Sequence, residues 1–139
     1  MRKTGTRNAR GFTLLELVIV LVILGTIMAF VGPKIFQGMG KANSATAKIM
    51  IQDIAGKLEI FRLEVGRYPT AQEGLQALVK QPPGVDKWAG PYLKDTDLKD
   101  PWGNDFRYNI PGSGKPYDVI SLGADNQPGG EGENRDVSN

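Results

Sequence analysis

A long apolar segment near the start of the chain limits what this protein can fold into more than any other feature. The 21 residues from Phe12 to Gly32 hold a single charged side chain, that of Glu16. A helix of this length is about 32 Å long, which matches the hydrocarbon core of a bilayer. Residues 12–33 are therefore predicted to form one membrane-spanning helix. The alternative is the core helix of a soluble protein, which so long a run with one charge disfavours.

The residues before the apolar segment carry only positive charge. Residues 1–11 hold four basic side chains and no acidic one. Because basic residues are retained on the cytoplasmic side of a membrane, the N-terminus is predicted to lie inside and residues 34–139 outside, which in a bacterium means the periplasm. A secretory signal peptide also joins a basic stretch to an apolar one, but its apolar part usually covers only about 7–15 residues.

The composition excludes most enzyme chemistry. The chain has 139 residues, of which 17 are basic and 15 acidic, and it contains neither cysteine nor histidine. It can therefore hold no Ser-His-Asp triad, cysteine nucleophile, zinc finger or disulfide. A hydrolase or a metal site built on carboxylates alone remains possible, as does a protein that acts by assembly.

An amphipathic pattern follows the apolar segment. Over residues 34–66, apolar residues recur at steps of three and four, which predicts a helix that packs its apolar side on a head domain. Gly66 marks the predicted end of this helix. Pro33 and Gly25 predict a kink or a local melting between them. The apolar positions are Ala47, Met50, Ile51, Ile54, Leu58, Phe61 and Val65.

Residues 67–139 are predicted to form a small head of mixed structure. Thr70 and Glu73 have the spacing of a capping box, which predicts a short helix over the apolar residues that follow. Two strand-like segments, 106–110 and 117–122, flank a turn rich in glycine and proline. A sheet of at most three antiparallel strands, packed on the long helix, makes the predicted fold class α+β.

The start of the apolar segment carries a family resemblance. The string GFTLLE, from Gly11 to Glu16, follows a short basic leader and resembles the signal of type IV pilins and type II secretion pseudopilins. The resemblance implies that a membrane-embedded prepilin peptidase cuts between Gly11 and Phe12, and that Phe12 becomes the N-methylated terminus. Loss of the leader, residues 1–11, removes four of the 17 basic residues and leaves 13 against 15 acidic ones.

Glu16 lies close to one end of the predicted span. Because an ionised carboxylate within a bilayer is costly unless it is paired, it is predicted to seek a cation at the same depth. The amine of Phe12 is such a cation, and in a filament the amine of one subunit could pair with Glu16 of its neighbour. The position alone leaves open that Glu16 reaches the headgroups and their water instead.

Motifs in the head resemble one branch of this family. The strings GRYPTAQEGLQALV, GPYLKD, DPWGNDFRY and YDVISLGADNQPGGEGENRD are similar to those of the major pseudopilins of type II secretion systems, the GspG family. The resemblance implies a pilin-like fold and a structural role in the inner membrane and periplasm, without catalysis. It implies a helical homopolymer that helps to export folded proteins across the outer membrane. The implied partners are further copies of the chain, minor pseudopilins, the prepilin peptidase, an assembly platform with its ATPase, and membrane lipid.

The acidic C-terminal segment is a candidate metal site. Residues 118–139 hold five acidic side chains against one basic side chain, interleaved with glycines. Oxygen ligands on a flexible backbone suit Ca²⁺, although the composition alone leaves a solvated acidic tail as the alternative. The family resemblance implies one bound calcium ion. The implied ligands are the carboxylates of Asp125 and Asp136 and the backbone carbonyls of Leu122 and of Val137 or Ser138.

Three other functions need consideration. Within the family, the alternative is a type IV pilin or a minor pseudopilin, against which the absence of cysteine and the acidic tail count. A membrane-anchored periplasmic hydrolase would need paired carboxylates, and for the candidate acids a solvated surface is the stronger expectation. A DNA-binding pseudopilin would need a basic patch in the head, so no nucleic-acid partner is predicted. The candidate hydrolase acids are Asp95, Asp97, Asp100 and Asp105.

Overall fold

The computed structural model describes residues 11–139, so the predicted leader lies outside the described residues except for Gly11. One helix, α1, spans Leu14–Val65 and has 52 residues. It is helical throughout the stretch before Pro33, so no local melting occurs there and the kink stays a prediction. Contacts divide the chain into two compact units, and the boundary lies between Phe36 and Gln37.

The second half of α1 carries the core of the head. Of the predicted apolar positions, Met50 and Val65 are half-buried. The other five have at most 1% of their surface exposed, as the periodicity predicted. All of these except Ala47 pack with apolar side chains from the rest of the head in one cluster. The helix ends as predicted, because Gly66 takes a φ of +91°. The buried side chains of α1 are Ala47, Ile51, Ile54, Leu58 and Phe61.

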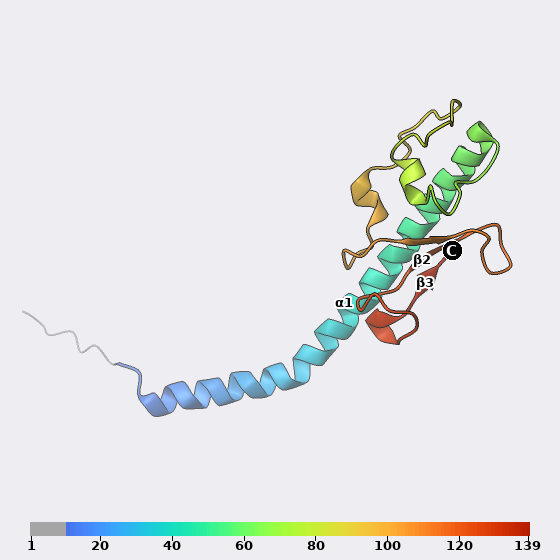
Figure 1. Ribbon diagram of the computed structural model, residues 1–139. Helices are drawn as coiled ribbons and strands as arrows, with labels where there is room; N and C mark the ends of the chain where they lie inside the picture. Colours follow the sequence, from blue (N-terminus) through green and yellow to red (C-terminus); the bar gives the residue numbers. More distant parts are fainter. Residues whose placement is uncertain (1–10) are drawn as a thin grey trace, which may run out of the picture. The chain divides into compact units, whose positions relative to one another are not determined.

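A three-stranded antiparallel sheet packs on this half of the helix. Its strands are β1 (Arg107–Asn109), β2 (Asp118–Ser121) and β3 (Val137–Ser138), in the spatial order β1-β2-β3. Figure 1 shows β2 and β3 beside α1, and the buried Val119 of β2 belongs to the same core as the helix. The two predicted strands are confirmed, each one residue shorter at either end. The short β3 was not predicted.

Short 3-10 helices complete the head: η1 (Leu75–Leu78), η2 (Asp95–Leu98) and η3 (Gly132–Asn134). The predicted capping box forms, because the Thr70 amide donates to Glu73 Oε2 at 2.8 Å and the Glu73 amide donates to Thr70 Oγ1 at 3.2 Å. The helix after it is only η1, shorter than the predicted one. Gly74 takes a φ of +58°, which prevents an α-helix from continuing through this position.

Candidate functional site

The start of α1 is built around the side chains of Thr13 and Glu16. The amide and the hydroxyl of Thr13 donate hydrogen bonds to Glu16 Oε2 at 3.0 and 3.1 Å. In return, the Glu16 amide donates to Thr13 Oγ1 at 3.2 Å. These reciprocal contacts form a capping box, which satisfies N–H groups that the first turn of a helix leaves without partners. Glu16 therefore has an intramolecular partner in a single subunit.

Sequence reasoning missed the part that Thr13 plays. Thr13 and Glu16 have the same T-x-x-E spacing as Thr70 and Glu73, and that spacing is the signal that could have revealed the pair. The pairing of Glu16 with the amine of Phe12 in a neighbouring subunit stays a prediction. The structure adds that the incoming amine must share Glu16 with Thr13 or displace it.

The N-terminal part of α1 exposes its apolar side chains on every side. All residues from Leu14 to Val31 are exposed, and an 18-residue window of the helix has a mean hydropathy of 2.8. The helix is long and apolar enough to cross a membrane. Exposing one large aliphatic side chain to water costs about 1.5–3 kcal/mol relative to burying it, so this surface needs cover from lipid or protein. Both residues of the predicted cleavage site, Gly11 and Phe12, are also exposed.

The acidic segment between β2 and β3, residues 122–136, folds back on itself and is called the C-terminal loop below. Its base is closed by a hydrogen bond of 2.9 Å from the Ala124 amide to the Glu133 carbonyl. Gly123 has a φ of +71°, and a Cβ at this position would lie 2.7 Å from the Glu133 carbonyl oxygen. Only glycine therefore allows the two arms to approach so closely.

The two predicted carboxylate ligands lie in this loop and are both exposed. Asp125 Oδ1 accepts a hydrogen bond from the Gln127 amide at 3.2 Å, and Asp136 Oδ2 accepts one from the Gly129 amide at 3.0 Å. Within residues 11–139, the second oxygen of each carboxylate has no hydrogen-bond donor or cationic partner. Each carboxylate thus keeps an oxygen that could bind a metal ion.

The predicted carbonyl ligands differ in their surroundings. The Ser138 carbonyl accepts a hydrogen bond from Lys48 Nζ on α1. Because a metal ion at the same oxygen would meet a positive charge, this contact favours Val137 over Ser138 as the ligand. Leu122 is buried directly after β2, where its carbonyl belongs to the base of the C-terminal loop.

A calcium ion would need these carbonyls. In the part of the chain that the structure describes, no three acidic side chains lie close enough together to hold a metal ion. Two carboxylates, backbone carbonyls and water form an all-oxygen set, which suits Ca²⁺ with its six to eight oxygen ligands. The residues of the C-terminal loop therefore fit calcium on the condition that carbonyls complete the coordination.

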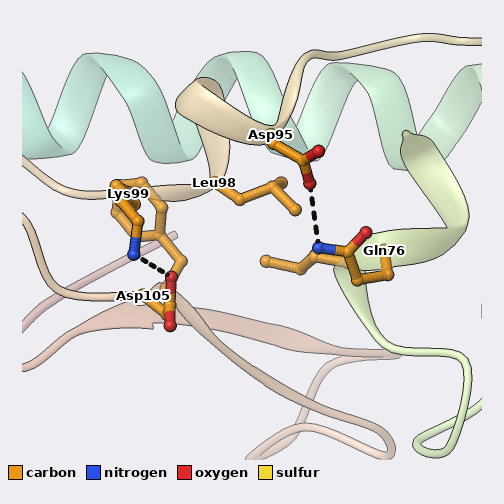
Figure 2. Close-up of a pocket in the computed structure, with 7 residues that line it drawn as sticks. Gln76, Asp95, Leu98, Lys99 and Asp105 are labelled. Carbon is orange, nitrogen blue, oxygen red and sulfur yellow. Dashed lines mark hydrogen bonds and ion pairs between the residues drawn. The ribbon is translucent and has the colours of Figure 1, made fainter. Parts of the chain in front are cut away.

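The acids considered for a hydrolase are each held by other groups of the head. Figure 2 shows a groove in which Asp95 accepts a hydrogen bond from Gln76 Nε2 at 3.1 Å, while Asp105 pairs with Lys99 at 2.8 Å. The carboxylate of Asp97 accepts the Lys94 amide at 2.9 Å and so caps η2. Each of these three side chains has a structural partner of its own. A fourth acid, Asp100, lies elsewhere in the head.

The expectation of a solvated surface is wrong for Asp100, which is only 5% exposed. Its Oδ1 accepts the amides of Trp102 at 3.1 Å and Asn104 at 2.9 Å, and its Oδ2 accepts the Ser121 hydroxyl at 2.6 Å. The DPWGN segment thus folds into a turn around this carboxylate, which buries it against β2. A run of turn-forming residues in a sequence does not reveal which of its acids points inward.

Comparisons with known proteins agree with this architecture. Residues 34–139 match the family described as Type II secretion system (T2SS), protein G, and residues 6–32 match the prokaryotic N-terminal methylation motif. The type II secretion system core protein G of Xanthomonas campestris pv. campestris is 42% identical over 136 residues, which cover 98% of this chain and 93% of that protein. The core protein G of Pseudomonas aeruginosa is 41% identical, with 96% of each chain covered.

A solved structure is also similar to this chain. The major pseudopilin from the type 2 secretion system of enterohaemorrhagic Escherichia coli matches with a TM-score of 0.60 and 30% sequence identity, over 73% of this chain and 90% of that chain. The match confirms the predicted pilin-like fold of a long N-terminal helix and a small antiparallel sheet. The chain therefore belongs to the type II secretion system protein G family, with the role of a major pseudopilin.

Proposed function

We propose that the chain is a membrane-anchored structural subunit that assembles with copies of itself into a helical periplasmic filament. The observation that carries this proposal is the exposed apolar surface of α1 from Leu14 to Val31. Such a surface is stable in lipid or against other apolar helices. Identical subunits that associate through heterologous, non-closing contacts generate a helical filament. The filament would then help to export folded proteins across the outer membrane.

The same helix accounts for both states of the subunit. In the inner membrane, the apolar N-terminal part of α1 spans the bilayer, with the N-terminus in the cytoplasm and the head in the periplasm. During assembly the apolar side chains exchange lipid for the helices of neighbouring subunits. Cleavage between Gly11 and Phe12 creates the N-terminal amine of Phe12. In the filament, Glu16 of a neighbouring subunit pairs with this amine and so sets the axial position of one subunit relative to the next.

The proposed role needs other components but no active site in this chain. The prepilin peptidase processes and methylates the N-terminus, an inner-membrane platform with its ATPase supplies the work, and minor pseudopilins join the filament. The absence of catalysis is supported by the structural role of the family.

Intact-mass analysis of the full chain, expressed with and without a prepilin peptidase, tests the proposal. With the peptidase, the chain should lose residues 1–11 and gain the mass of one methyl group at Phe12. A Gly11→Leu variant should stay uncleaved, because a branched side chain replaces the glycine before the scissile bond. A wild-type chain that stays uncleaved in the presence of active peptidase would contradict the proposed processing and the assembly that depends on it.

We further propose that the C-terminal loop binds one calcium ion. The ligands are the side chains of Asp125 and Asp136, the carbonyl of Leu122, and the carbonyl of Val137 or Ser138. The ion would neutralise two carboxylates and join the two arms of the loop. Because it binds only the folded loop, it stabilises the head by a free energy that rises with the logarithm of the calcium concentration once that concentration exceeds the dissociation constant.

Melting of the full chain in calcium and in EDTA tests the metal site. Wild type should melt at a higher temperature in calcium, and Asp125→Ala or Asp136→Ala should lower that temperature and remove the effect of EDTA. Asp86→Ala is the matched control, since Asp86 is an exposed acid outside the loop and should keep the wild-type response. A wild-type melting temperature that is equal in both buffers would overturn the proposal.

A further inference from the structure

A chain of hydrogen bonds connects the buried Asp100 to both polar groups of Gly123, at the base of the C-terminal loop. The Ser121 hydroxyl donates to Asp100 Oδ2 at 2.6 Å and accepts the Gly123 amide at 3.3 Å. The Asn104 amide donates to Asp100 Oδ1 at 2.9 Å, while Asn104 Nδ2 donates to the Gly123 carbonyl at 3.0 Å. These four residues are called the Asp100 network. Ser121 and Asn104, which both contact Gly123, are therefore held by one carboxylate, while the Asn126 amide adds a contact of 3.4 Å to the Gly123 carbonyl from within the loop.

The Asp100 network determines the direction of the Leu122 carbonyl. The Leu122 carbonyl and the Gly123 amide belong to one planar trans peptide, in which they point in opposite directions. Because the amide points to Ser121 Oγ, the carbonyl must point away from Ser121. The Cα of Gly123 also lies close to the other arm of the loop, since a Cβ there would lie 2.7 Å from the Asn134 carbonyl carbon.

The charge of Asp100 is not balanced by a neighbouring cation. Among residues 11–139, no lysine or arginine nitrogen lies within 4.0 Å of its carboxylate. A buried carboxylate without a cation is costly, even where hydrogen bonds satisfy its oxygens. The hydrogen bonds from Ser121, Trp102 and Asn104 are therefore what hold the carboxylate in place.

We infer that Asp100 is a positioning residue for the calcium ion. Through Ser121 it holds the Leu122–Gly123 peptide, and through Asn104 the peptide that follows, in the orientation that presents the Leu122 carbonyl to the ion. Asp100 itself does not touch the ion. This inference rests on the proposed calcium site and assigns a role to the DPWGN segment, which the filament and the loop carboxylates leave without one.

Calcium titration of the full chain in detergent micelles, followed by isothermal calorimetry, tests this role. Asp100→Asn should raise the calcium dissociation constant about tenfold or more, as loss of an outer-shell partner commonly does. Asp105→Asn is the matched control, because Asp105 directly follows the DPWGN segment, is exposed, and pairs with Lys99. Its dissociation constant should stay within about twofold of wild type.

A second pair of measurements separates positioning from general stability. The melting temperature in EDTA reports the fold without the ion, and the dissociation constant reports the site. A merely structural Asp100 would lower the melting temperature in EDTA and leave the calcium affinity of the folded chain unchanged, which would overturn the inference. Ser121→Ala removes the same connection with a smaller change, so it carries the test if Asp100→Asn does not fold.

The double variant completes the test. If Asp100 acts through Ser121, the two substitutions should not add. The double variant, Asp100→Asn with Ser121→Ala, should then have a calcium dissociation constant no higher than that of the single variant with the higher constant. If wild type binds calcium and both single variants have dissociation constants within about twofold of its value, the positioning role alone is overturned. Wild type that gives no binding heat and no response to EDTA would overturn the calcium site itself.

Discussion

Thr13 determines how the Glu16 carboxylate is held in a single subunit. Replacing Thr13 with the isosteric valine removes the hydroxyl that both accepts the Glu16 amide and donates to its carboxylate. Loss of an N-terminal cap costs about 1 kcal/mol. Hydrogen exchange at the Glu16 amide, measured by mass spectrometry in micelles, should therefore become several-fold faster in Thr13→Val. Thr13→Ser keeps the hydroxyl and should exchange like wild type, and equal rates in all three proteins would exclude the cap.

The Glu73 carboxylate, in the turn after α1, makes the stability of the head depend on pH. Arg67 donates to both carboxylate oxygens of Glu73 at 2.7 Å, and the Thr70 amide adds a third bond. These contacts, above all the Arg67 hydrogen bonds, lower the pKa of Glu73 from 4.5 to about 2. Because the folded pKa lies below the unfolded one, this stabilisation is complete above pH 4.5 and disappears as the pH falls toward 2.

Denaturant unfolding at two pH values tests this contribution. At pH 6, the free energy of unfolding of Glu73→Gln should be lower than that of wild type by about 1–2 kcal/mol. The difference is smaller than the pKa shift alone would give, because Arg67 is partly exposed and solvent screens the ion pair. At pH 3 the difference should be smaller, because the carboxylate in unfolded wild type is then largely protonated. A difference that is the same at both pH values would show that the carboxylate charge does not contribute.

At the scale of elements, the C-terminal loop and α1 meet at a glycine. Gly40 is buried, and a Cβ there would lie 2.7 Å from the Cβ of Glu133 in η3. Gly38 lies in the same turn of α1, is exposed, and has open space around it. The two glycines are therefore a matched pair that separates helix propensity from contact with the loop.

Alanine at these two positions should have opposite effects on the stability of the head. Gly38→Ala should stabilise it by about 0.5–1 kcal/mol, because alanine forms helix better than glycine. Gly40→Ala gains the same propensity but forces η3 away from α1, so its melting temperature should fall below that of wild type. Equal stabilisation by both substitutions would mean that η3 can move away from α1 without any loss of stability.

At the scale of the whole molecule, the proposed processing site and the head core lie in different compact units. Leu58 is fully buried in the head, and Leu58→Ala should lower the stability of the head by about 2–5 kcal/mol. The cleavage between Gly11 and Phe12, measured by intact mass, should continue at the wild-type level. Leu63, 77% exposed on the same helix, supplies the control, since Leu63→Ala should leave both measurements unchanged.

Local patterns in the sequence determined much of this protein. The apolar run from Phe12 to Gly32 identified the exposed helix, and the stripe from Ala47 to Phe61 identified the face that forms the core. The first two strands and Gly66 were also predictable. These features depend on residues within one or two turns of each other, and the period of a helix or a strand records such spacing directly.

Only the tertiary structure decided the features that join distant segments. Lys48 and Ser138 are 90 positions apart, and nothing near either residue predicts their contact. The strand β3, the approach of Gly40 to Glu133 and the burial of Asp100 against Ser121 have the same origin. Whether an acid in a turn is solvated or buried depends on which segment packs over it, and that follows from the arrangement of the whole head.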